Sequence, residues 1–556
     1  MNISHIAQQW DLVIIGGGIT GAGILREATN IGLQALLVEQ KDFAWGTSSR
    51  SSKLVHGGLR YLKEGHFLLT KMAVEERELL LKQAPGLVEP LEFLLPVYEH
   101  QRPGKRTLKI GLSLYDLMAH ERQHRFYDKT EFYRRMPYVR QHGLKGGFCF
   151  SDAQVDDSRL VLRLINESVA AGAAALNYTA AIDILRNDAG EVVGVNIADT
   201  ETRQSRTLST RTVINATGCW AEKLHPSPDP GRHLRPLRGS HLVFSAEVLP
   251  IKFGVSFVHP QDNRMIFVLP WEGAVLTGTT DLDHKTDLSQ EPTITEDEIV
   301  YLMEGLNTLF PSIKISLKDC ISAFAGLRPV LSEGKRLPQE ESREHVVWVD
   351  KGLVTVTGGK LTTFRRLAWD ALRAAKPFLP SGKYVDKHKP LFCKPPDGPL
   401  NRFGLADRVW RRLYGRYGQG ADALAQAAEP QDLMHIPGTH TLWAELPFAA
   451  ANEQVRHLDD LLLRRVRIGL LTPEGGKAHL KRIRNLCQPA LPWDGKRWKE
   501  EIAMYTELWN RLHALPVQQA IKKRSKLLTP FMAAGKRLGT MTTKFLPKRW
   551  RSNPNG

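Results

Sequence analysis

The chain opens on two short apolar runs separated by a glycine-rich turn. Leu12–Ile15 is rich in β-branched residues and predicts a buried parallel strand, and Ala35–Val38 predicts a second one. Between them, Ile19–Ile31 has the length of a helix, which Gly32 is placed to end. This order predicts one βαβ unit over Asp11–Glu39.

Helical and strand patterns alternate along the next 340 residues. Helical spacing predicts helices over Phe67–Lys82 (with Glu75, Glu76, Arg77 and Glu78 facing outward), Ser158–Ala171, Thr295–Leu309 and Leu361–Ala375. Apolar runs and alternation predict strands over Ala173–Ile184, Val192–Ile197, Thr212–Asn215, within 240–280 and over Val346–Val356. The hydroxyl-rich run Thr47–Ser52 predicts a loop.

Six prolines within residues 377–400 predict a linker, and the pattern beyond it is helical. Helices are predicted there over Arg402–Tyr414, Asn452–Val466, Pro473–Cys487 and Trp498–Leu512, and no strand. The predicted class is α/β, with five parts: a discontinuous Rossmann-type domain (1–90, 150–235 and 345–376), a mixed-sheet substrate domain (91–149 and 236–344), the linker 377–400, an all-α domain (401–515) and a tail (516–556).

Composition narrows the class of protein. The 556 residues suffice for two or three domains, and no run approaches the ~20 apolar residues that span a bilayer. The N-terminus lacks the basic and apolar regions of a secretory signal, so none is predicted. The five cysteines are scattered without a C-x-x-C, which argues against a metal site and against an oxidising compartment.

The net charge of +17 is concentrated at the C-terminal end. Ten Lys/Arg lie in residues 516–556, and no acidic residue follows Glu507. This excess predicts a polyanionic partner, either nucleic acid or an anionic membrane surface. Apolar and basic positions share one stretch of the tail, as in an interfacial helix: Val517, Ala520, Ile521, Leu528 and Phe531 beside Lys522, Lys523, Arg524 and Lys526. A solvated extension is the alternative.

The glycine-rich turn carries a G-x-G-x-x-G pattern. Gly16 permits a tight turn, Gly18 lets the backbone approach a pyrophosphate, and Gly21 lets helix and strand pack closely. The N–H groups at Ile19 and Thr20, where the helix begins, are placed to bind the pyrophosphate. Glu39 and the adjacent Gln40 stand about 20 residues further on, where an acid binds a ribose hydroxyl. Dinucleotide binding is predicted; a glycine-rich turn of another α/β domain is the alternative.

Further segments favour a flavin over a nicotinamide cofactor, because they suit a long ligand held along its length. Thr47, Ser48, Ser51, Ser52 and Lys53 offer donors to phosphate and ribityl groups. Ala181 offers backbone pairing beside the adenine, and the turn Ala216–Gly218 brings backbone close to the cofactor. Lys360, Leu361 and Thr362 begin a helix whose positive end would support charge on a reduced flavin.

Several motifs occur in an order that resembles a known family. They are IGGGITGAG, TSSRSSKLVHGGLRYL, SDAQVDDSRLV, NATGCW, GSHLVF, GTTDLD, AGLRPV and GGKLTTFRRLA, within residues 14–368. The chain resembles the FAD-dependent, membrane-associated aerobic glycerol-3-phosphate dehydrogenases, of the D-amino-acid-oxidase-like flavoproteins. The resemblance covers 10–370 well and 401–512 by pattern only. Departures at Leu25, Glu27, Ile31, Gly32, Cys219 and Phe364 mark a divergent member.

The resemblance implies a site as well as a fold. It implies a Rossmann-type FAD-binding domain, oxidation of sn-glycerol 3-phosphate to dihydroxyacetone phosphate, and electron transfer to a quinone. Arg328 and Arg343, fifteen residues apart, match the family's phosphate-binding arginines, and Arg60 and Tyr61 match a substrate-side pair. His56 is the candidate base, since its ordinary pKa lies near neutrality; His241 and His259 are weaker candidates for the same role.

The implied location is the cytoplasmic face of the inner membrane, where the protein would be peripheral. A homodimer is one possible assembly. Three other functions are alternatives to this one. The first is an FAD-dependent oxidase or dehydrogenase of an amino or hydroxy acid, whose carboxylate the arginines would hold. The second is a flavin-linked tRNA-modifying protein, against which the isolated cysteines count, so a nucleic-acid partner is not expected. The third is a non-catalytic flavoprotein.

Overall fold

The computed structural model describes residues 3–59, 65–119, 124–225, 233–332, 334, 341, 344–382, 386, 388–394 and 403–515. The chain divides into two compact units, Met1–His513 and Ala514–Gly556. The predicted basic tail (516–556) and part of the predicted linker lie outside the described residues. The fold below is that of the first unit.

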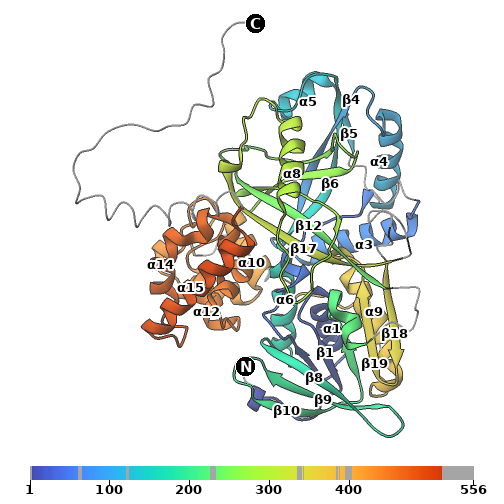
Figure 1. The fold of residues 1–556 in the computed structure, drawn as a ribbon, viewed down its shortest axis with the longest axis vertical. Helices are drawn as coiled ribbons and strands as arrows, with labels where there is room; N and C mark the ends of the chain where they lie inside the picture. The colour runs from blue at the N-terminus through green and yellow to red at the C-terminus, as the bar shows by residue number, and fades with distance from the viewer. Residues whose placement is uncertain are drawn as a thin grey trace, which may run out of the picture. The chain divides into compact units, whose positions relative to one another are not determined.

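The predicted βαβ unit is the centre of a parallel sheet (Figure 1). The strand order is β18 (His345–Asp350), β19 (Leu353–Gly358), β11 (Val213–Asn215), β1 (Leu12–Ile15), β2 (Ala35–Val38), β7 (Ala174–Leu176). Only the edge strand β18 runs antiparallel to its neighbour among these described strands. The fold is therefore of the doubly wound, Rossmann type.

Successive side chains of β1 enter two different cores, as the period of a strand requires. Leu12 and Ile14 pack with helices α1 (Ile19–Asn30), α6 (Asp157–Ala170) and α9 (Phe364–Ala375). Val13 and Ile15 pack against an antiparallel sheet of β8 (Thr179–Arg186), β9 (Val192–Asp199) and β10 (Ser205–Ser209). Both faces of the parallel sheet are thus covered, which explains why β1 is apolar throughout.

A second, mixed sheet holds the remaining strands. Their order is β16 (Leu282–Asp283), β12 (Leu234–Ser245), β15 (Ala274–Gly278), β14 (Met265–Trp271), β13 (Gly254–Val258), β4 (Val88–Tyr98), β6 (Leu144–Val155), β3 (Leu54–Val55). In addition β17 (Cys320–Leu331) pairs with β12, and β5 (Arg125–Tyr127) pairs with β6. Three longer helices, α3 (Phe67–Gln83), α4 (Lys105–Ala119) and α8 (Glu296–Leu309), and the short α5 (Lys129–Arg135) accompany it.

Residues 403–515 are helical, and the only strand-like pairing described there is a single bridge between His435 and Leu442. The helices, orange to red in Figure 1, are α10 (Asp407–Tyr417), α11 (Gly420–Ala427), α12 (Glu445–Asn452), α13 (Ile468–Leu471), α14 (Leu480–Cys487) and α15 (Gly495–Leu512). A π-helical segment, Asp460–Arg465, precedes α13.

The predicted fold class is confirmed, whereas the domain boundaries stay predictions. Several elements differ from the predicted ones. The run Ala173–Ile184 forms two strands, β7 and β8, because the chain turns at Asn177–Tyr178 from the parallel sheet into the antiparallel one. The helix predicted from Arg402 begins at Asp407. The helix predicted over Asn452–Val466 is interrupted, since α12 ends at Asn452 and the π-helical segment begins at Asp460.

The outward orientation predicted for the acidic and basic side chains of α3 is wrong for two of them. Glu76 and Arg77 are buried. Glu76 accepts from Arg366 Nε at 2.6 Å, and Arg77 donates to Asp152 Oδ1 at 3.1 Å. Such pairs are formed by side chains distant in sequence, so helical spacing alone treats their charges as solvent-facing.

Candidate active site

A cavity of about 1130 Å³ opens at the carboxyl ends of β1 and β2. Ile15 and Val38 line it at the ends of these strands, and Phe93 and Phe150 line it from the mixed sheet. Ligands of open α/β sheets bind at this edge. The described residues predicted as cofactor ligands line the cavity, with two exceptions, Gly21 and Lys53.

The glycines at the start of α1 are required by close contacts. Gly16 has a φ of +115°, and a Cβ there would be 2.6 Å from the carbonyl oxygen of Ala216. Gly21 lies behind the cavity wall, where a Cβ would be 1.9 Å from the Gly16 oxygen. Gly18 faces the cavity, since a Cβ there would meet only Ser48 Oγ within 4 Å. The backbone is therefore open to a ligand at Gly18 and close-packed on either side.

Glu39 ties the glycine turn to the end of β2. One carboxylate oxygen accepts from the Gly17 N–H at 2.7 Å and the other accepts from the Lys41 N–H at 2.9 Å. Burial raises the pKa of the Glu39 carboxyl, and these two donors oppose the rise. Because each oxygen keeps a second lone pair, a ribose hydroxyl can share one of them. Gln40 lines the cavity beside it.

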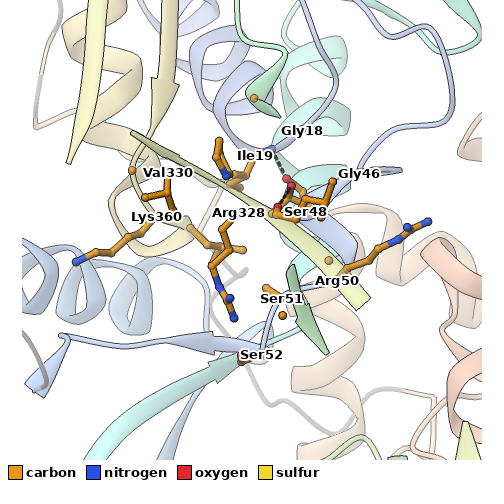
Figure 2. A pocket seen from close by; sticks show the side chains of 18 of the residues that line it. Gly18, Ile19, Gly46, Ser48, Arg50, Ser51, Ser52, Arg328, Val330 and Lys360 are labelled. Carbon is orange, nitrogen blue, oxygen red and sulfur yellow. Dashed lines mark hydrogen bonds between the residues drawn. The ribbon is translucent and has the colours of Figure 1, made fainter. Parts of the chain in front are cut away.

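The segment Thr47–Ser52 is a short 3₁₀ turn (Thr47–Ser49) followed by a bend, and the hydroxyls of Thr47, Ser48, Ser51 and Ser52 are bonded to the protein. Ser48 Oγ accepts from the Ile19 N–H at 2.9 Å (Figure 2). Thr47 donates to the Leu327 carbonyl, and Ser51 donates to Asp157 at 2.8 Å. The loop is therefore held in one arrangement against the start of α1.

Lys53, predicted as a cofactor ligand, does not line the cavity. Its ammonium is buried against the Asp157 carboxylate at 2.8 and 2.9 Å and donates to the Ser49 carbonyl at 2.6 Å. Burial, together with nearby Arg467, lowers the pKa of Lys53 to about 7, although Asp157 opposes the change. Lys53 therefore supports the loop from behind.

The far end of the cavity is lined by two more predicted backbone turns. A Cβ at Gly218, which has a φ of +60°, would meet no atom within 4 Å. Lys360 precedes the 3₁₀ turn Leu361–Thr363, which leads into α9. Thr362 Oγ1 accepts from the His56 N–H at 3.2 Å, so the segment that carries His56 is fastened to this turn. His56 and Lys360 both line the cavity.

Arg328, on β17, is aimed into the cavity (Figure 2). Its guanidinium donates to Asp281 Oδ1 at 2.9 Å and to Thr279 Oγ1 at 2.7 Å. Arg264, which the sequence pattern did not single out, lies 3.7 Å from the other oxygen of the same carboxylate. Arg264 and Asp281 also line the cavity. Two guanidinium groups thus share one buried carboxylate, which leaves positive charge for an anion.

The two weaker histidine candidates do not line the cavity. His241 is buried behind Ser52, to whose hydroxyl its Nε2 is bonded at 2.9 Å, and its ring stacks on Phe324. Burial, with Arg328 and Lys53 nearby, holds the pKa of His241 well below its usual value. His259 is buried on Tyr301 and bonded to its carbonyl at 2.9 Å. Three predicted site residues, Arg60, Tyr61 and Arg343, lie outside the described residues.

These features fit a flavin adenine dinucleotide. The open backbone at Gly18, the start of α1 and the acid Glu39 suit an ADP group, and the open turn at Gly218 leaves room for a ring system beyond it. The family model for FAD-dependent oxidoreductases matches residues 11–365. A second model, described as the C-terminal domain of alpha-glycerophosphate oxidase, matches residues 395–498.

Curated relatives are similar over most of the chain. The aerobic glycerol-3-phosphate dehydrogenase of Staphylococcus haemolyticus is 34% identical over 487 residues, which is 82% of this chain and 86% of that protein. The chain belongs to this FAD-dependent dehydrogenase family. The enzyme of the same name from Staphylococcus aureus is 35% identical over 483 residues, with the same shares covered. FAD is therefore the cofactor of this member.

A solved structure shows the same fold over nearly the whole length. The glycerol-3-phosphate dehydrogenase of Bacillus halodurans, complexed with FAD, superposes with a TM-score of 0.68 at 28% identity. The match covers 90% of this chain and 95% of that one. Within the described segments, no helix has the length and apolar content to cross a membrane. The described residues also contain no cluster of His, Cys, Asp and Glu suited to a metal ion.

Proposed function

We propose that this family member oxidises sn-glycerol 3-phosphate to dihydroxyacetone phosphate. The observation that carries the proposal is the position of Arg328 and Arg264, which face the cofactor cavity around a shared Asp281. Relatives that are 34–35% identical over most of the chain are named for this substrate. Near pH 7 a phosphate monoester carries about two negative charges and three acceptor oxygens. Two guanidinium groups offer the positive charge and the N–H donors that bind it.

The arrangement of the arginine explains how the substrate would be oriented. The Thr279 hydroxyl, the Thr280 carbonyl and the Asp281 carboxylate accept hydrogen bonds from the Arg328 guanidinium, so its position at the cavity is fixed. In the proposed orientation, a phosphate held at Arg328 leaves the rest of a three-carbon substrate within the same cavity, which Lys360 and Thr362 also line. Holding the reacting carbon in one position supplies much of the rate enhancement in such a reaction.

The isoalloxazine of FAD, when bound, supplies the two-electron acceptor. We propose that the C2–H bond of the substrate breaks with both electrons as a hydride, while the C2 hydroxyl loses its proton to His56. The histidine lines the cavity and its backbone is fixed by Thr362, so its imidazole is the described group best placed as a base. Arg60, Tyr61 and Arg343 stay predicted substrate ligands.

We further propose that a membrane quinone receives the electrons and that the protein binds the anionic surface of the cytoplasmic membrane. Support comes from exposed apolar side chains on two helices: Phe67 and Leu68 on α3, and Ile110 and Leu117 on α4. Ile110 and Leu117 are 71% and 70% exposed and share α4 with exposed Lys105, Arg106 and Lys109. Apolar side chains beside cations are typical of a surface that lies on anionic lipid.

A substrate panel tests the proposed reaction. The purified holoenzyme is mixed anaerobically with glycerol 3-phosphate, glycerol, lactate and an amino acid, and the flavin absorbance is followed. We expect bleaching with glycerol 3-phosphate and none with the three compounds that lack phosphate. Bleaching by lactate or the amino acid would instead show that the arginines hold a carboxylate.

A further inference from the structure

Three arginines of the C-terminal helical region reach into the walls of the cofactor cavity from behind. Arg464 and Arg465 end the π-helical segment Asp460–Arg465, and Arg467 follows two residues later. All three are at most 3% exposed. Arg467 has a φ of +64°, a left-handed conformation that is unfavourable for a residue with a Cβ. The chain thus adopts a strained turn at the position where these side chains are delivered.

The first two arginines hold the connection that follows β2. Arg465 donates to both oxygens of Asp42, at 2.6 and 2.8 Å, and Arg464 also bonds to this carboxylate. Asp42 lies between Lys41 and Trp45, which line the cofactor cavity next to Glu39. The carboxylate itself is fully buried. The ribose end of the cavity is therefore anchored to the helical region by a bidentate ion pair.

The third arginine holds the hydroxyl loop. Arg467 donates to the Ser49 carbonyl at 2.8 Å and to Asp157 at 3.2 Å. Asp157 in turn accepts from the N–H and the hydroxyl of Ser51, at 2.9 and 2.8 Å. Ser48 and Ser51 line the cavity on either side of Ser49. Arg467 therefore fixes the backbone between two serines that line the cavity, without lining the cavity itself.

From these contacts we infer that Arg464, Arg465 and Arg467 are positioning residues for FAD. They keep two cavity-lining loops in the arrangement that binds the cofactor: the connection after β2 that carries Asp42, and the segment Thr47–Ser52. Neither loop has a long helix or strand of its own, so its order depends on such tertiary contacts. A loop already held in the bound arrangement loses less conformational freedom when the ligand binds. The helical region then determines how firmly the cofactor is retained, independently of which substrate is oxidised.

The test compares two ion-paired arginines of the same helical region, Arg467 and Arg412. R467M removes the contacts to Ser49 and Asp157. R412M removes an ion pair of similar size whose arginine is 11% exposed: Arg412 bonds to Glu272 and Glu445, neither of which lines the cavity. The rate of FAD release is measured by diluting each holoenzyme and following the fluorescence of free flavin. Thermal melting at saturating FAD reports the general loss of stability.

We expect R467M to release FAD about tenfold faster than the parent, which corresponds to about 1.4 kcal/mol, while R412M releases it at the parental rate. R467K, which keeps the charge but loses the planar fork, is expected to be intermediate, and it decides the question if R467M does not fold. The inference is overturned if R467K and any folded R467M retain FAD like the parent. It is also overturned if R412M accelerates release equally, since the effect would then be a general loosening.

Discussion

The guanidinium of Arg328, on β17, is bonded to the connection that follows β15 at the proposed site. Its partners there are Thr279 and Asp281, and the Arg328 side chain is 30% exposed. A side chain fixed on two sides binds an anion with little further loss of freedom. The backbone of Arg328 is also fixed, because it is paired with Leu237 in the β12–β17 ladder. The proposed phosphate ligand is therefore held at both its backbone and its side chain.

Replacing Arg328 with methionine should raise the KM for glycerol 3-phosphate by about 10- to 100-fold, because a charge-assisted hydrogen bond contributes about 1.5–3 kcal/mol. FAD content should stay at the parental level. Steady-state kinetics with a dye acceptor measure the change. R238M is the matched control, since Arg238 lies on neighbouring β12 and pairs with Glu298 outside the cavity. Equal KM values for R328M and the parent would contradict the proposed role.

Residues whose role depends on contacts near them in sequence could be predicted, whereas residues positioned by partners distant in sequence could not. Gly16 and Gly21 are required by contacts within the same βαβ unit and its neighbouring strand, so their pattern is visible in the sequence. Lys53 follows the hydroxyl-rich loop directly, which suggested a cofactor ligand. Its ammonium instead pairs in the interior with Asp157, 104 residues away in sequence. Arg264 joins the site because it precedes β14, which pairs with β15, the strand that leads into Asp281.

At the scale of elements, alternation and helical spacing predicted the type of most elements and less of their orientation. The strands predicted within 240–280 are present, and β15 pairs antiparallel with both β12 and β14. The helix predicted from Thr295 begins there with a capping box. Helical spacing gave the wrong orientation for Glu76 and Arg77, because charged side chains are expected at the surface and these two are buried. It also gave one continuous helix where the chain has a break, between α12 and the π-helical segment.

A pH-dependent contact is predicted between the antiparallel β8–β10 sheet and α15. His457 bonds to Glu201 at 2.8 Å and to Glu501 at 3.0 Å. Burial alone would lower the pKa of His457, but these two carboxylates outweigh it and raise the pKa to about 10. Because the folded-state value exceeds the ordinary one of about 6.5, the stabilisation is complete below pH 6.5 and is lost as the pH rises towards 10.

H457Q should therefore melt below the parent at pH 6, and the difference should shrink as the pH approaches 10. Thermal melting of both proteins across this range measures it. The exposed His142 supplies the control, since H142Q should show no such dependence. A difference between H457Q and the parent that is constant from pH 6 to pH 10 would show that the imidazole is not charged in the folded protein.

At the scale of the whole molecule, the sequence predicted a nucleotide-binding sheet, a mixed sheet and a helical region, and all three are present. What it did not predict is how the helical region is joined to the nucleotide-binding part. That junction consists of buried arginines, such as Arg159 bound to Glu453 and Arg465 bound to Asp42. Pairs separated by about 300–400 residues leave no local pattern. The homodimer and the domain boundaries stay predictions.

The proposed membrane surface is also a property of the whole molecule. Replacing Leu68, Ile110 and Leu117 together with glutamate should reduce binding to anionic vesicles at least tenfold, because each apolar side chain contributes about 1.5–3 kcal/mol when fully buried. Sedimentation with vesicles measures the bound fraction. V300E, which alters an exposed apolar residue on α8, should bind like the parent. Unchanged binding of the triple variant would place the membrane contact elsewhere.

The central claim is that this cavity holds glycerol 3-phosphate with its C2–H bond against FAD. The most direct test is anaerobic stopped-flow mixing of the holoenzyme with glycerol 3-phosphate, protonated or deuterated at C2, while flavin absorbance is recorded. We expect rapid bleaching that is slower with the deuterated substrate, because this bond breaks in the step observed. A flavin that stays oxidised with both substrates would contradict it.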